Sequence, residues 1–131
     1  MTARIIEFEA PCGRVDPNAR GHWRAKAETV KQWRHAARLA AHNSGPVGYR
    51  ALVTIEFTVP DRRKRDPHNW VATAKPIVDG LTDAGLWPDD TAAHVTVAEP
   101  ILVVDPANKD RVRIAIEPAP PARNPFQQET P

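Results

Sequence analysis

The apolar positions of this chain recur with two different periods. Residues 49–59 are rich in β-branched and aromatic residues that alternate with polar ones over much of their length, which predicts a strand with one buried face. Residues 24–41 are rich in alanine and long side chains, and their apolar residues recur at helical spacing. We therefore expect a helix there, with a stripe formed by Val30, Trp33, Ala37 and Ala40.

The same patterns predict four further elements. Residues 4–9 form a first strand, and residues 11–23, with two prolines and two glycines, form a loop. Residues 94–104 form a strand interrupted at Pro100, and residues 111–117 alternate cleanly. Because a tight polar turn, residues 105–110, separates these last two strands, we expect them to pair as an antiparallel hairpin.

A second helix is expected over residues 69–84. Its inward stripe would be formed by Val71, Ala74, Val78 and Leu81, while Lys75, Asp79, Thr82 and Asp83 stay outside. Pro76 lacks a backbone N–H and disfavours helical geometry at Lys75, so we expect the helix to kink there or to begin near Pro76.

The resulting order is strand, helix, strand, helix, strand, strand. It predicts an α+β fold, a small mixed sheet with two helices on one face, as a single domain over residues 1–117. Residues 118–131 contain five prolines and little apolar content, which is typical of a disordered tail.

Charge is distributed unevenly, although the net charge is only +2. Residues 1–75 carry 14 Lys or Arg against 7 Asp or Glu, whereas residues 76–131 carry 4 against 9. This asymmetry suits a surface for polyanions beside a carboxylate site, but solvated faces also segregate charge. On the first helix Lys31, Arg34 and Arg38 fall on one side, which is either a solvated face or a contact with phosphates.

Cys12 is the only cysteine, so an intramolecular disulfide and a four-cysteine zinc site are excluded. The sequence lacks an apolar run of about 18 residues and a signal-peptide core, so we expect a cytoplasmic protein without a membrane span.

The most unusual stretch, residues 61–90, combines four consecutive cations with aspartates at both ends. Asp66 and Asp90, with Asp89 in reserve, offer the hard oxygen ligands that Mg²⁺ prefers. The cations that precede Asp66 are suited to holding phosphate oxygens: Arg62, Arg63, Lys64 and Arg65. Each part also has a simpler interpretation, because the segment 66–69 can be a turn with Asn69 as a helix N-cap, and Asp89-Asp90 can be a loop.

These residues together resemble the core of the RusA-like Holliday junction resolvases, many of which are encoded by phages or prophages. The resemblance rests on the run from Asp61 to Asp66, Asn69, Lys75, Asp79-Gly80-Leu81, Ala84-Gly85-Leu86-Trp87 and Asp89-Asp90. Outside this stretch it extends more loosely, with an N-terminal loop near Pro17-Asn18.

The resemblance implies a homodimeric, Mg²⁺-dependent endonuclease that binds four-way DNA junctions and makes paired nicks in recombination and repair. It implies catalytic roles for Asp66, Asp90 and Lys75, and DNA contact by Arg65. Two positions depart from the family pattern. His68 stands where a second aspartate is common, and Lys75 follows Asn69 by six positions where three are usual.

His68 is therefore a candidate ligand that favours Mn²⁺ over Mg²⁺, because imidazole binds Mn²⁺ and later divalent metals better than it binds Mg²⁺. If His68 is only a turn residue, Asp89 or Asp79 has to supply the missing carboxylate. One alternative to the enzyme is a DNA-binding dimer of the same fold that has lost cleavage through His68. Another is an accessory protein whose Pro-rich tail recruits a partner and whose Asp-rich loop is structural.

Overall fold

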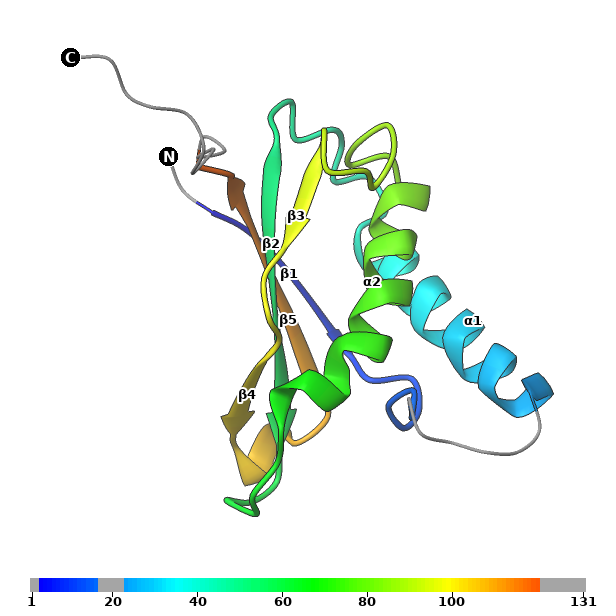
Figure 1. Ribbon diagram of the computed structural model, residues 1–131, viewed down its shortest axis with the longest axis vertical. Coiled ribbons are helices and arrows are strands. Elements are labelled where there is room, and N and C mark those ends of the chain that lie inside the picture. The colour runs from blue at the N-terminus through cyan, green and yellow to red at the C-terminus, as the bar shows by residue number, and fades with distance from the viewer. Residues whose placement is uncertain (1–2, 17–22, 121–131) are drawn as a thin grey trace, which may run out of the picture.

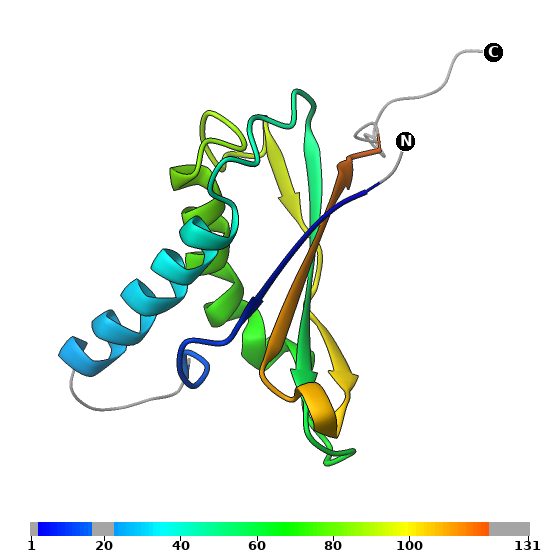
Figure 2. The same cartoon turned by 180° about the vertical axis from the view of Figure 1, so that it is seen from behind.

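A computed structural model describes residues 3–16 and 23–120 of the chain. The regular elements follow the predicted order, and both helices lie on the same face of the sheet (Figures 1 and 2). The predicted loop around Pro17-Asn18 and residues 121–131 of the predicted tail lie outside the described residues. The strands are β1 (Arg4–Glu9), β2 (Ala51–Val59), β3 (Val95–Val97), β4 (Ile101–Val104) and β5 (Arg111–Pro118); the α-helices are α1 (Trp23–Ala40) and α2 (Val71–Asp83); the 3-10 helices are η1 (Pro67–Trp70) and η2 (Pro106–Asn108).

The strands form one mixed sheet in the order β1-β5-β2-β3, with β4 also paired to β2. β2 pairs antiparallel with β5 and parallel with both β3 and β4. The α+β prediction with a small mixed sheet is thus confirmed. The strand expected over residues 94–104 is interrupted before Pro100, as its sequence predicts, and its two halves, β3 and β4, line successive lengths of β2.

The predicted C-terminal hairpin is wrong, because β4 and β5 are both neighbours of β2 and do not pair with each other. The connection between them contains η2, which Asp105 caps by accepting a hydrogen bond from the Ala107 amide. The Asp105 amide donates to the carbonyl of Val59, the last residue of β2, at 2.9 Å. The chain therefore passes around the end of β2 and returns on its other side.

The core lies between the sheet and the two helices. Every second residue of β2 is buried, and in β5 Val112, Ile114 and Ile116 face the same way. Trp33 of α1 packs its ring edge-on against Phe8 and Phe57, which joins the first helix to two strands. This alternation in the strands and the 3.6-residue period in the helices bury the apolar residues in one layer.

Gly80 allows α1 and α2 to approach closely. A methyl group at this position would lie 2.9 Å from the Ala37 Cβ and would overlap the backbone carbonyl of Arg34. A larger residue would therefore force the helices apart. This approach matters for the site because it brings α1 beside the outer face of α2.

Three features of α2 differ from the sequence-based expectations. The helix begins at Val71 and includes Pro76, so of the two expected outcomes, a kink at Lys75 or a start near Pro76, the late start is wrong. Ala74, Val78 and Leu81 are buried as predicted, whereas Val71, the first residue of the helix, is 42% exposed. Asn69 is not an N-cap: η1 precedes α2, and the side chain of Asp66 caps η1.

Candidate functional site

The end of α2 reverses the chain and returns an aspartate to the outer face of the helix. Gly85, with φ of 88°, follows the helix, and the amides of Gly85 and Leu86 donate to the carbonyls of Thr82 and Leu81. This is the glycine-dependent C-terminal motif in which a left-handed residue satisfies the last carbonyls. Leu86 and Trp87 are then buried, and the Trp87 indole N–H donates to the Thr82 hydroxyl at 2.7 Å. The loop is thus anchored before it reaches Asp90.

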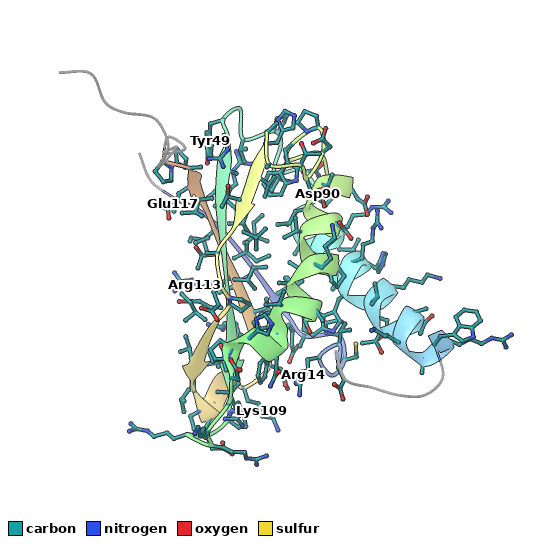
Figure 3. All side chains as sticks on the ribbon, viewed as in Figure 1. Arg14, Tyr49, Asp90, Lys109, Arg113 and Glu117 are labelled. Atoms are coloured by element: carbon teal, nitrogen blue, oxygen red, sulfur yellow. The ribbon has the colours of Figure 1, made fainter. Side chains whose placement is uncertain are left out.

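Lys75 bridges two carboxylates at this point. Its Nζ lies 2.7 Å from Asp90 Oδ2 and 3.1 Å from Asp79 Oδ1. Asp79 comes from the next turn of α2, whereas Asp90 comes from the loop beside the helix in Figure 3. The exposed fractions of the three side chains are 67% for Lys75, 24% for Asp79 and 31% for Asp90, so the lysine is exposed and both carboxylates are partly exposed.

The ionisation of the group follows from these contacts. The Lys75 ammonium, which donates a hydrogen bond to the Asp90 carboxylate, lowers the pKa of Asp90 below its ordinary value. Hydrogen bonds to Asp90 and then to Asp79 raise the pKa of Lys75. Lys75 is therefore a cation and Asp90 an anion near neutral pH.

Arg34 joins α1 to the same face. Its Nε and Nη2 donate to the two carboxylate oxygens of Asp83 at 2.6 and 2.8 Å, a forked ion pair between the helices. Arg34 lowers the pKa of Asp83, mainly through this hydrogen bond. Of the three cations predicted on this helix for DNA contact, Arg34 is thus engaged by a carboxylate, whereas Lys31 and Arg38 are exposed.

Asp66 and His68 lie just before α2, where Asp66 is the N-cap of η1 and His68 is a residue of η1. Asp66 Oδ1 accepts a hydrogen bond from the His68 backbone amide at 3.0 Å, so the carboxylate closes its own turn. Both residues are exposed. Within residues 3–16 and 23–120, no three side chains of His, Cys, Asp or Glu gather closely enough to hold a metal ion. The ligand role predicted for Asp66 and His68 thus stays a prediction, and Lys75 is the residue that joins a second carboxylate, Asp79, to Asp90.

Asp89 has a local role in its loop. Its Oδ1 accepts hydrogen bonds from the Thr91 amide at 3.0 Å and the Thr91 hydroxyl at 2.5 Å. These two bonds, the hydroxyl first, lower the pKa of Asp89. This is the simple loop interpretation of Asp89, and it leaves Asp90 free to turn toward Lys75.

The cations before Asp66 differ in their environment. The side chain of Arg65 is only 15% exposed and pairs with Asp61 at 3.0 Å, whereas the side chain of Arg63 is 75% exposed. Arg62 and Lys64 are also exposed, and neither makes an ion pair with any residue that the structure describes. Three of the four predicted phosphate-binding cations thus face solvent.

Arg14, labelled in Figure 3, is a further cation that the sequence patterns do not single out. Its guanidinium lies over the Trp70 ring, 4.9 Å from the centroid, and donates to the Asn69 carbonyl at 3.3 Å. The loop that carries it is fixed by the Val15 amide, which donates to the buried Thr73 hydroxyl at 2.9 Å. Nothing in the local sequence signals this contact, because 55 positions separate Arg14 from Asn69.

Comparison with known proteins adds one relative. No protein-family model matches the chain. An uncharacterized protein of Xylella fastidiosa (strain Temecula1 / ATCC 700964) is 38% identical over 80 residues, which is 56% of this chain and 52% of that protein. The match thus spans about half the length of that relative, and its name carries no activity to this chain.

None of the helices in residues 3–16 and 23–120 has the length and apolar character that crossing a membrane requires.

Proposed function

We propose that this protein is a metal-dependent endodeoxyribonuclease that cuts four-way or branched DNA junctions. The observation that supports this proposal best is the group formed by Lys75, Asp79 and Asp90, in which one ammonium bridges two accessible carboxylates. Metal-dependent phosphodiester hydrolysis uses carboxylates to hold a cation and a further positive charge to stabilise the transition state. The resemblance to the RusA-like resolvases supplies the substrate.

The donor set at this group fits a hard divalent cation. Mg²⁺ is commonly held by one or two carboxylates together with waters and substrate phosphates, so a group of three ligands is not required. Asp90 and Asp79 are the residues proposed to hold it, and their oxygens already share one cationic neighbour, Lys75 Nζ. When bound, the ion polarises the scissile phosphate and lowers the pKa of attacking water.

Lys75 and the exposed cations would act on the DNA. Lys75 carries a compact charge on a flexible stem, which suits it to follow the charge that develops on the phosphate. Arg62, Arg63 and Lys64 provide sequence-independent contacts with backbone phosphates. A homodimer would place two such sites on one junction, which accounts for paired nicks.

Asp66 and His68 remain in the proposal as residues that the resemblance implies. They precede α2, whereas Asp90 follows it, and their contribution is separable from that of Asp79 by single substitutions. Mn²⁺ is the preferred metal if His68 is a ligand, and Mg²⁺ if Asp79 takes its place.

A second candidate is a DNA-binding dimer without cleavage activity. The observation that favours it is that Lys75 neutralises Asp79 and Asp90 directly, so a divalent cation has to displace or share this ammonium. Under this alternative the exposed cations bind junctions and the carboxylate group is structural.

One experiment separates the two. Purified protein is incubated with a labelled synthetic four-way junction and with linear duplex of the same sequence, in Mg²⁺, Mn²⁺ or EDTA. The nuclease predicts symmetric nicks in the junction with either metal and binding without cleavage in EDTA. Binding without nicks under all three conditions favours the second candidate, and no preference for the junction contradicts both.

A further inference from the structure

An ion pair between Asp61 and Arg65 lies within the loop formed by residues 61–66. Asp61 Oδ1 accepts a hydrogen bond from the Arg63 amide at 3.0 Å and lies 3.0 Å from Arg65 Nη2. The other terminal nitrogen of Arg65 donates back to two carbonyls of the same loop, those of Asp61 at 2.8 Å and Arg63 at 3.2 Å. One guanidinium and one carboxylate therefore satisfy several groups of a five-residue segment.

The geometry points to a clamp between Asp61 and Arg65 that holds this loop in the conformation that presents Arg62 and Lys64 to phosphate. Arg65 is thus a positioning residue rather than a phosphate contact. Asp61, although negatively charged, would be required for binding a polyanion. This inference rests on the proposed DNA-binding function for its ligand, but the clamp itself can be tested on the free protein.

Exposure separates Arg65 from the cations that it presents. The Arg65 side chain is 15% exposed, whereas Arg62 and Lys64 are exposed, so the cation nearest to Asp66 is the one turned inward. Arg63 is also exposed, but its Nη2 lies 3.6 Å from Asp61 Oδ2. Arginine suits this place because its planar fork donates to several acceptors at once, which lysine cannot do. The loop also lines a hollow of about 530 Å³ together with Pro100 and β4, so it is open on this side, and the contacts between Asp61 and Arg65 are internal to the loop.

Charge alone predicts the opposite effect for Asp61. Removing a carboxylate from a cationic loop lowers electrostatic repulsion and should strengthen the binding of DNA. If the clamp orders the loop, Asp61→Ala weakens binding instead, because the free loop has to be ordered when it binds. The sign of the change therefore distinguishes the two descriptions.

The first test needs no DNA. Trypsin cuts after arginine and lysine, and Asp61→Ala keeps every cleavage site in the loop. We expect cleavage after Arg62, Arg63 or Lys64, identified by mass spectrometry of the new termini, to accelerate roughly tenfold in this variant. Arg65→Lys should accelerate it similarly, because lysine keeps the charge and the cleavage site but loses the fork. Glu99→Ala is the matched control, since it removes one exposed carboxylate beside Pro100 and should not alter the rate.

The second test measures junction binding in EDTA by the same variants. We expect Asp61→Ala to bind about threefold to tenfold more weakly, Glu99→Ala to bind as well as wild type or better, and Asp61→Ala/Arg65→Ala to be no weaker than Arg65→Ala alone. Unchanged trypsin cleavage in Asp61→Ala overturns the clamp. Faster cleavage with unchanged or tighter binding overturns its presenting role. Wild-type protein that binds no DNA contradicts the proposed function, while the trypsin rates still decide whether the clamp exists.

Discussion

Lys75 Nζ lies 2.7 Å from Asp90 Oδ2, across 15 positions of sequence. The contact depends on the reversal of the chain at Gly85, where φ is positive. Glycine adopts this conformation at low cost because it has no Cβ. The same ammonium reaches Asp79, so one cation orders two carboxylates from different segments.

Replacing Lys75 with methionine should raise the pKa of Asp90 toward its ordinary value of 3.8, since the ammonium is the largest cause of the depression. A carboxyl group whose pKa is lower in the folded than in the unfolded protein stabilises the fold at pH values above its unfolded-state pKa. This stabilisation is lost as the pH falls through the folded-state pKa. The wild-type contribution is therefore lost only below about pH 4. Carbon-detected NMR titration of the aspartate carboxyls measures the shift. Asp83, paired with Arg34, is the internal control and should titrate as before.

Gly80→Ala should destabilise the fold by about 2 kcal/mol or more, because the added methyl meets backbone of α1. Better helix propensity returns only about 1 kcal/mol. Urea unfolding measures the change in the free energy of unfolding. Gly13→Ala is the matched control, since a methyl there meets no atom within 4 Å. Equal stabilities of the two variants would rule out the close approach of α1 and α2.

Arg34 and Arg38 should differ in DNA binding, although one helix carries both. The fork of Arg34 is held by Asp83, whereas Arg38 is exposed. Arg38→Ala should reduce the slope of log affinity against log salt by about one, as expected when a phosphate contact is lost. Arg34→Ala should leave this slope nearly unchanged and cost at most about 1 kcal/mol of stability. If Arg34→Ala reduces the slope and Arg38→Ala leaves it unchanged, Arg34 has to leave Asp83 when DNA binds.

His68→Ala and His68→Asp test whether this position belongs to the metal site. If His68 is a ligand, His68→Asp shifts the preference of cleavage from Mn²⁺ toward Mg²⁺, and His68→Ala loses activity with both ions. Lys75 joins Asp79 to Asp90, which makes Asp79 the proposed second carboxylate, so we expect His68→Ala to retain most of its cleavage activity. A loss of about tenfold or more with both metals would return His68 to the site.

The fold could be predicted from sequence where the signal was local. Alternation in residues 51–59 marked β2, and helical spacing marked α1 and α2. The predicted hairpin is wrong because the sequence pattern of two alternating segments joined by a short turn does not show which strands pair. The pattern is the same whether the two strands pair with each other or lie on opposite sides of a third strand. Val71 was placed inside because it continues the spacing of Ala74 and Val78, although the buried face had already turned away from it.

The candidate site was less accessible to sequence analysis. The sequence indicates Lys75 and Asp90 as candidate site residues. Their contact depends on the chain reversal at Gly85 and on the burial of Trp87, and the sequence alone does not give the resulting distance between the two side chains. Asp79 was only a reserve carboxylate, although its spacing of four from Lys75 on a helix is a detectable signal. Arg65 was grouped with its neighbours because composition does not reveal which cation turns inward.

The central claim is that Asp90, held by Lys75, is a catalytic carboxylate. The most direct measurement is single-turnover cleavage of a four-way junction by Asp90→Asn in Mg²⁺ and in Mn²⁺, beside Asp105→Asn, which replaces a capping aspartate outside the site. We predict that Asp90→Asn cleaves about a hundredfold more slowly or worse, with binding in EDTA retained, while Asp105→Asn cleaves like wild type. Cleavage by Asp90→Asn at the wild-type rate with either metal would contradict the account.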